Sequence, residues 1–146
     1  MIRRIAREIV LQSLFQIDFT KCEPAFALAA AVEFQTEGDE DKAVVDVHKE
    51  EELAKAKEYA EKLLDGIMSN LEAVDASIGQ YAIDWTVERM PATDRNILRI
   101  ATYEMLFADE KLVPGVAINE AVEIAKMYGT DESPRFINGI LGKMVK

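Results

Sequence analysis

Apolar residues recur at helical spacing along most of this chain. In residues 49–70, Leu53, Ala56, Ala60 and Leu64 fall on one face of a helix. No segment shows the strict alternation of apolar and polar residues that is typical of a half-buried strand. The helices that the spacing predicts cover residues 3–19, 23–35, 49–70, 71–84, 90–108 and 116–129, with a last one from residue 133 onwards. We therefore predict an all-α fold of six to seven helices.

Signals for helix ends occur in the second half of the chain. Thr93 has the side chain of an N-cap, and Asp94 after it places a negative charge in the first turn, where the helix dipole favours it. Gly129 is predicted to end the helix over 116–129. Ser133 is predicted to cap the last helix, with Pro134 in its first turn.

The first predicted helix carries a small cluster of positive charge. Arg3, Arg4 and Arg7 fall within an arc of roughly 100° when successive residues are placed 100° apart. Ile5 and Ile9 lie on the opposite side, so we predict that the three arginines form an exposed basic face. From the spacing alone, ion pairs with nearby carboxylates and contacts to phosphate groups explain these arginines equally well.

The basic cluster contrasts with the rest of the chain, which is acidic. The 146 residues carry a formal net charge of -10 at pH 7. Residues 33–65 contain twelve Asp and Glu against five Lys, and we predict a variable acidic loop over residues 36–52. Non-specific binding of nucleic acid depends on broad basic surfaces, so this net charge disfavours it, but binding through one local patch is compatible with it.

The residues needed for most enzymatic chemistry are scarce. His48 is the only histidine and Cys22 the only cysteine, so the chain lacks the ligands for a zinc site or a di-iron site in a helical bundle. No glycine-rich phosphate loop is present. We predict a protein that is not an enzyme and holds no metal or cofactor. The absence of a disulfide pair, a signal peptide and a long apolar run predicts a cytoplasmic protein without membrane contact.

The single tryptophan, Trp85, has two interpretations. Its ring can pack in the core or at a hinge, or it can stack on a ligand. Packing is the more common role of a large aromatic side chain and is favoured here.

Three stretches of the chain resemble a known family. The segments "TDRNILRIATYEML" and "VAINEAVEIAKMYGTDESPRFINGILGK" in the C-terminal third, together with "RRIAREIVLQSLFQID" at the start, closely resemble the NusB family of bacterial transcription antitermination factors. The resemblance implies a single NusB-like domain over residues 1–146, built from two packed three-helix subdomains. We place these subdomains at residues 1–78 and 79–146.

The resemblance also implies a function. Members of this family bind the boxA element of nascent single-stranded RNA together with NusE, a small-subunit ribosomal protein, in the antitermination complex of RNA polymerase. Such a factor supports transcription of ribosomal RNA operons. The alternative is an acidic helical adaptor that binds a protein partner but no RNA. The sequence leaves the choice between monomer and homodimer open.

The resemblance also implies roles for individual residues. The residues that match RNA-binding positions of the family are Arg3, Arg4, Arg7, Arg99, Glu132, Arg135 and Phe136. Phe136 either stacks on RNA or packs within the protein. Asp94 matches an acidic position at the NusE contact, and its other role is the charge in the first turn of a helix.

Overall fold

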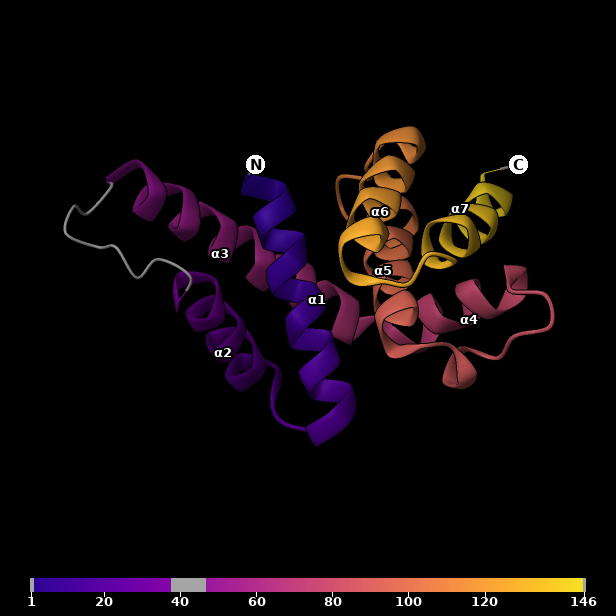
Figure 1. Cartoon of the computed structure of the whole chain (residues 1–146), viewed down its shortest axis with the longest axis horizontal. Coiled ribbons are helices and arrows are strands. Elements are labelled where there is room, and N and C mark those ends of the chain that lie inside the picture. The colour runs from indigo at the N-terminus through magenta and orange to yellow at the C-terminus, as the bar shows by residue number, and fades with distance from the viewer. Residues whose placement is uncertain (1, 38–46, 146) are drawn as a thin grey trace. The chain divides into compact units, whose positions relative to one another are not determined.

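The computed structural model describes residues 2–37 and 47–145, and these residues contain helices and no strand (Figure 1). The α-helices are α1 (Ile2–Thr20), α2 (Pro24–Glu37), α3 (Val47–Ser69), α4 (Leu71–Tyr81), α5 (Ala92–Thr102), α6 (Pro114–Tyr128) and α7 (Ser133–Met144). Two short helical turns, η1 (Val87–Arg89) and η2 (Tyr103–Phe107), flank α5. The predicted all-α fold is confirmed. None of the described helices is long and apolar enough to cross a membrane.

The chain divides into two compact units, Met1–Asp65 and Gly66–Lys146, which we call the N-terminal and C-terminal units. The division falls inside α3, before the position between residues 78 and 79 where the sequence placed it. The last turn of α3 belongs to the C-terminal unit, where Gly66 lies against the ring of Tyr103.

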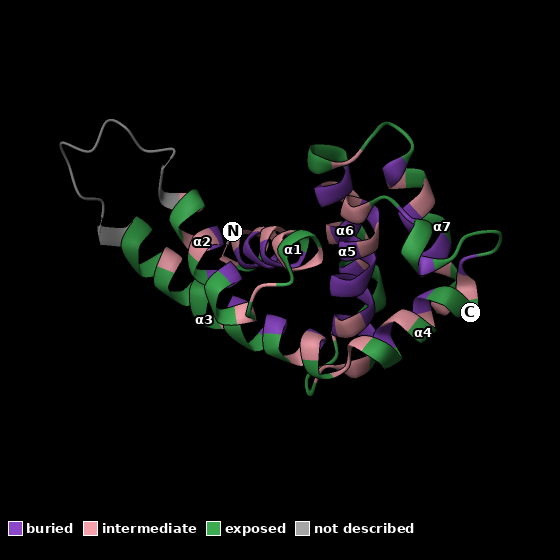
Figure 2. Ribbon diagram, turned by 90° about the horizontal axis from the view of Figure 1, so that it is seen from below, coloured by how far each residue is buried: buried purple, intermediate pink, exposed green. Residues whose placement is uncertain are grey.

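The core of the N-terminal unit is built around α1, which packs against α2. Figure 2 shows that most of the middle of α1 is buried. A helix that is apolar on several sides must be covered by several neighbours, and burial here removes aliphatic side chains from water. The fully or almost fully buried apolar residues of this unit are Ala6, Ile9, Val10, Leu11, Leu14, Ala27, Leu28, Ala31, Ala56, Ala60, Leu63 and Leu64.

The central helix of the C-terminal unit is α5, which packs against α4, α6 and α7. Residues 96–102 are all buried, including the polar Asn96, Arg99 and Thr102. A helix buried on all sides places its polar side chains inside the protein, where they need hydrogen-bond partners. The polar contacts of α5 therefore help to fix its position against the helices that they reach.

The acidic loop predicted over residues 36–52 is wrong at both of its ends. α2 continues to Glu37, and α3 already begins at Val47, so the backbone of His48 lies in a helix. Glutamates in the first turn of a helix are favoured by the helix dipole, which explains why α3 extends toward the acidic segment. Residues 38–46 lie outside the part of the chain that the structure describes.

Two predicted caps are wrong in detail. α5 begins at Ala92 with Pro91 before it, so Thr93 lies inside the first turn and makes no capping hydrogen bond. α7 begins at Ser133 itself. Its hydroxyl accepts a hydrogen bond from the backbone N–H of Thr130, at 2.9 Å, and so closes the preceding turn instead.

The helix predicted over residues 90–108 consists of two parts. α5 ends at Thr102, and η2 continues as a wider π-helical turn in which the N–H of Ala108 donates to the carbonyl of Tyr103, at 2.9 Å. Such turns occur mostly as single insertions at the end of or within α-helices. Helical periodicity alone does not separate the two forms, because both keep the chain helical.

A close contact joins the start of η2 to the last turn of α3. A Cβ atom on Gly66 would overlap the hydroxyl and ring carbons of Tyr103. Desolvation of the Tyr103 hydroxyl by burial, with smaller contributions from Asp109 and Glu104, raises its pKa above the ordinary value. Gly66 is therefore required by the space that the tyrosine ring occupies.

We expect Gly66→Ala to lower the free energy of unfolding by about 1–3 kcal/mol, because the added methyl group displaces the Tyr103 ring. This loss outweighs the gain of about 1 kcal/mol that alanine brings inside a helix. Chemical denaturation measures the change. Gly139→Ala in α7 is the matched control, since nothing lies within 4 Å of its added Cβ atom. Equal stability of the two variants would contradict the close contact.

Candidate nucleic-acid interface

The basic start of α1 presents one clearly exposed arginine. Arg3 is exposed, and its guanidinium lies over the ring of Tyr59 from α3, with 5.4 Å between the Cζ atom and the ring centroid. A cation at this distance is attracted by the negative face of the ring. A guanidinium above a ring can keep its in-plane N–H groups available to a phosphate. Tyr59 therefore holds Arg3 without occupying those donors.

The other two arginines of α1 differ in exposure. Arg4 is half-buried, and Arg7 retains only 4% of its accessible surface. The prediction of an exposed basic face is therefore wrong for Arg7. The reason is its position one turn further along α1, next to Ala6 and Ile9, where the helix is already covered on several sides.

Three of the residues that the resemblance places at RNA lie close together in sequence at the start of α7. Glu132 and Arg135 are exposed, and Phe136 is half-buried. The turn before them is organised by Ser133, whose side chain is 1% exposed. Its hydroxyl oxygen accepts the N–H of Thr130 and lies 3.3 Å from the hydroxyl of that residue. These contacts fix where α7 begins and therefore where Arg135 and Phe136 are presented.

Gly129 has no side chain and so leaves space for the Ser133 hydroxyl group. It ends α6 as predicted, with an extended backbone. A Cβ atom at this position would overlap the Ser133 hydroxyl group and lie 2.9 Å from the carbonyl oxygen of Ala125. A glycine is therefore needed here because a Cβ atom has no space, and not because the backbone is left-handed.

Asp94 lies inside the C-terminal unit rather than on its surface. Its side chain is in the first turn of α5 and is 6% exposed. Desolvation by burial raises the pKa of its carboxyl group, and a hydrogen bond from the Ser133 hydroxyl opposes that rise. The single proton of Ser133 thus serves Asp94 while its oxygen accepts from Thr130. Asp94 joins α5 to the turn that presents Arg135 and Phe136.

Arg99 is also internal. It is 7% exposed, and its Nε and Nη2 atoms donate to the two carboxylate oxygens of Asp75, each at 2.8 Å. Its Nη1 atom donates to the side-chain oxygen of Asn96 at 2.9 Å. This two-pronged pairing joins α5 to α4. The sequence suggested Arg99 as an RNA contact, and the structure places its guanidinium in a partly buried ion pair with Asp75.

Trp85 is the aromatic residue whose position the sequence left open. It is 44% exposed, and its ring meets Phe136 nearly edge-on, with 5.6 Å between centroids and 68° between planes. Sequence reasoning favoured packing for Trp85 and had no signal for this pairing, because the two residues are far apart in the chain. Its location between α4 and η1, outside any predicted helical face, was the only available hint.

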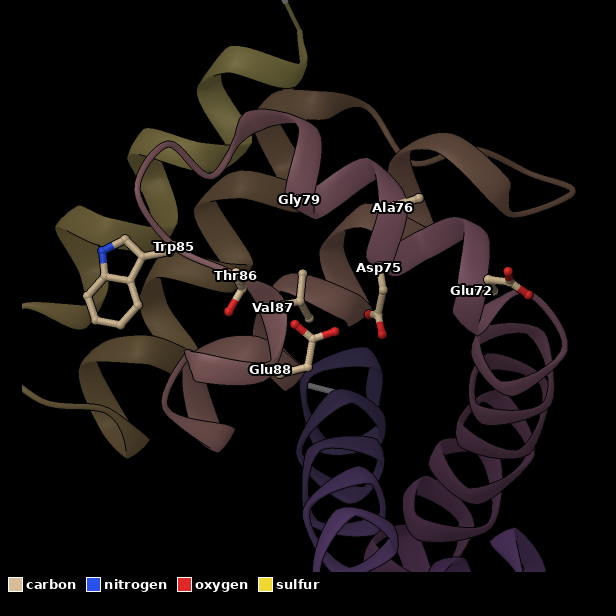
Figure 3. Close-up of a pocket in the computed structure, with 8 residues that line it drawn as sticks. All are labelled: Glu72, Asp75, Ala76, Gly79, Trp85, Thr86, Val87 and Glu88. Carbon is tan, nitrogen blue, oxygen red and sulfur yellow. The ribbon is translucent and has the colours of Figure 1, made fainter.

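Trp85 also lines a shallow pocket of about 500 Å³ in the C-terminal unit (Figure 3). The other lining residues are Glu72, Asp75, Ala76, Gly79, Thr86, Val87 and Glu88. The pocket therefore combines carboxylates from α4 and η1 with one aromatic ring. Among the described residues, no group of three or more His, Cys, Asp or Glu side chains could hold a metal ion.

Comparison with known sequences gives matches over the whole chain. A sequence model of the NusB family matches residues 4–146. Transcription antitermination protein NusB of Symbiobacterium thermophilum is 45% identical over 147 residues, covering 100% of this chain and 90% of that protein. The protein of the same name from Heliobacterium modesticaldum is 42% identical over 148 residues, which cover 100% of this chain and 63% of that protein.

Solved structures share the fold. T. maritima NusB has a TM-score of 0.77 and 37% sequence identity, covering 97% of this chain and 89% of that one. A crystal structure of antitermination factors NusB and NusE in complex with double-stranded RNA has a TM-score of 0.75, covering 98% of this chain and 95% of that one. At 24% identity, the second likeness shows the fold alone.

We expect Arg99→Met to lower the free energy of unfolding by about 2–4 kcal/mol, because Asp75 is left without its partner. The effect is below that of a fully buried pair, since the Asp75 side chain is 26% exposed. The double variant Arg99→Met with Asp75→Leu should recover much of this stability, because no charge is then left unpaired. Denaturant titration of the three proteins tests this. A single and a double variant of equal stability would contradict the ion pair.

The raised pKa of Asp94 predicts a pH dependence of stability. The folded protein keeps the proton to higher pH than the unfolded chain, whose ordinary value is 3.8. As pH rises above 3.8, the unfolded chain ionises first, so the free energy of unfolding should fall relative to that of Asp94→Asn. Asparagine can still accept from Ser133 and does not ionise. Urea titrations between about pH 3 and 7 measure this, and a rising difference would contradict the burial of the carboxylate.

Proposed function

The chain belongs to the NusB family of transcription antitermination proteins, and on that premise we propose that it binds boxA RNA together with the ribosomal protein NusE. The observation that carries the proposal is the family match over residues 4–146. The chain is accordingly a non-enzymatic factor. The assembly with NusE and RNA would join the antitermination complex of RNA polymerase and support transcription of ribosomal RNA operons.

The proposed RNA contacts come from side chains that solvent can reach. Arg3 and Arg4 supply cationic donors from the N-terminal unit, and Arg135 supplies one from the C-terminal unit. Phe136 offers the accessible part of its half-buried ring to a base, and the Glu132 carboxylate can accept from a base amino group. Arg7 and Arg99 support the fold instead, because their side chains are almost fully buried.

The proposed role of Asp94 follows from its burial. An acidic chain suits a basic ribosomal protein, since opposite charges steer the encounter and suppress wrong partners. Asp94 itself is 6% exposed and bonded to Ser133, so we assign it to holding the start of α7. The charges that attract NusE would then come from exposed carboxylates elsewhere on the chain.

A titration separates this function from that of an acidic adaptor. Labelled boxA RNA and a scrambled RNA of the same length are titrated with the chain, with and without NusE, and anisotropy is recorded. The proposal expects tighter binding of boxA RNA and a further gain with NusE. Binding of NusE by calorimetry, with no RNA binding in any mixture, would favour the adaptor.

We expect Arg3→Ala with Arg4→Ala to weaken RNA binding by about 2–4 kcal/mol and to reduce the salt slope by about 0.7 for each phosphate that these arginines neutralise. Stability should fall only slightly, by about 0.5–1 kcal/mol, because alanine cannot replace the attraction between the Arg3 guanidinium and the Tyr59 ring. RNA affinity at several salt concentrations and a thermal melt provide the two measurements.

Arg7→Ala is the matched control for the same helix. It should lower the melting temperature more than the double variant does, because a buried side chain is truncated, and leave the salt slope unchanged. If removal of Arg3 and Arg4 left the salt slope unchanged, these arginines would not contact phosphate.

A further inference from the structure

Trp85 is held in place although its ring is exposed. The N–H of Trp85 donates to the carbonyl of Ala82, which closes a tight turn after α4. Asp84 within this turn has a left-handed backbone, with φ 68°, a conformation that aspartate tolerates better than most residues. The indole is therefore carried by a defined turn and is 44% exposed. A large aromatic ring exposed to this extent leaves apolar surface in contact with water.

The contact between Phe136 and Trp85 does not cover the indole as a parallel stack would. Phe136 and Trp85 meet at 68°, so their contact uses an edge of one ring against the other. This geometry differs from a parallel stack, in which each ring would cover a face of the other. An unpaired nucleic-acid base has a flat face that stacks on such rings, whatever its sequence.

The charged residues around Trp85 favour different parts of a nucleotide. Figure 3 shows the indole at one end of the pocket, apart from the carboxylates of Glu72 and Glu88. Those carboxylates repel phosphate, whereas base amino groups can donate to carboxylate oxygens. The exposed Arg135 directly precedes Phe136 in α7 and provides the cation that a phosphate needs.

We propose that Trp85 is an RNA-binding residue on which an unpaired base stacks, with the adjoining phosphate at Arg135. This inference rests on the proposed RNA binding and adds a residue to it. The ring pair, the fixed turn and the neighbouring cation carry the inference. The competing occupant is a basic peptide, whose cation would lie on the indole and pair with the carboxylates.

The chain contains one tryptophan, so its fluorescence reports on this site alone. A single-stranded boxA RNA should quench the emission of the wild-type protein with NusE present, using a NusE variant without tryptophan. Inorganic tripolyphosphate at matched charge should leave the emission unchanged, because it has no base to stack. RNA binding is followed in parallel by anisotropy. Quenching by oligolysine but not by RNA would assign the site to a basic peptide and overturn the proposal.

Substitution provides the second arm of the test. Trp85→Ala should weaken RNA binding roughly 5- to 150-fold, the range for loss of one base–aromatic stack, with an unchanged salt slope. Trp85→Phe should retain part of the affinity because it keeps a ring. Ile83→Ala is the matched control, since Ile83 is a 68% exposed residue of the same turn and should change affinity less than twofold.

The outcomes distinguish this inference from the proposed function. RNA binding by the wild-type protein, together with unchanged emission and unchanged affinity of Trp85→Ala, would overturn the stacking role and leave the proposed function intact. Absence of RNA binding by the wild-type protein in anisotropy, with NusE present, would overturn both.

Discussion

The C-terminal unit depends on the pairing of Arg99 with Asp75. A guanidinium that is 7% exposed needs an anionic partner, because a buried unpaired charge is costly. Both oxygens of Asp75 meet it at 2.8 Å, and the two-pronged geometry fixes the approach of α5 to α4 more closely than apolar packing alone. Because α6 and α7 also pack against α5, the pair holds in place the helix around which the unit is built.

Both segments of this unit that we propose to contact RNA connect to that pair of helices. The turn that carries Trp85 starts where α4 ends, and Asp94 at the start of α5 bonds to Ser133 at the start of α7. Trp85 and Phe136 meet because α4 and α7 are each held against α5. Residues that do not touch a ligand thus position those that we propose to do so.

Helical periodicity and the family motifs were sufficient to predict the all-α fold and most helix bounds. The exposure of single charged residues was harder to predict, since Arg3 and Arg7 have the same spacing pattern and opposite burial. Arg99 and Asp75 lie far apart in the chain, so their pairing is a product of the tertiary structure. The same holds for Trp85 and Phe136, whose contact no local signal encodes. Sequence therefore identified candidate residues but not which of them face inward.

The central claim is that RNA contacts the solvent-accessible residues proposed above, Trp85 included, while the buried Arg7 and Arg99 maintain the fold. Photo-cross-linking tests it most directly, with 4-thiouridine placed through boxA RNA, NusE present and the joined peptides identified by mass spectrometry. The account predicts cross-links in the peptides that contain Arg3 and Arg4, and in those that contain Trp85 and Phe136. Efficient cross-linking confined to other peptides, with none at either of these places, would contradict it.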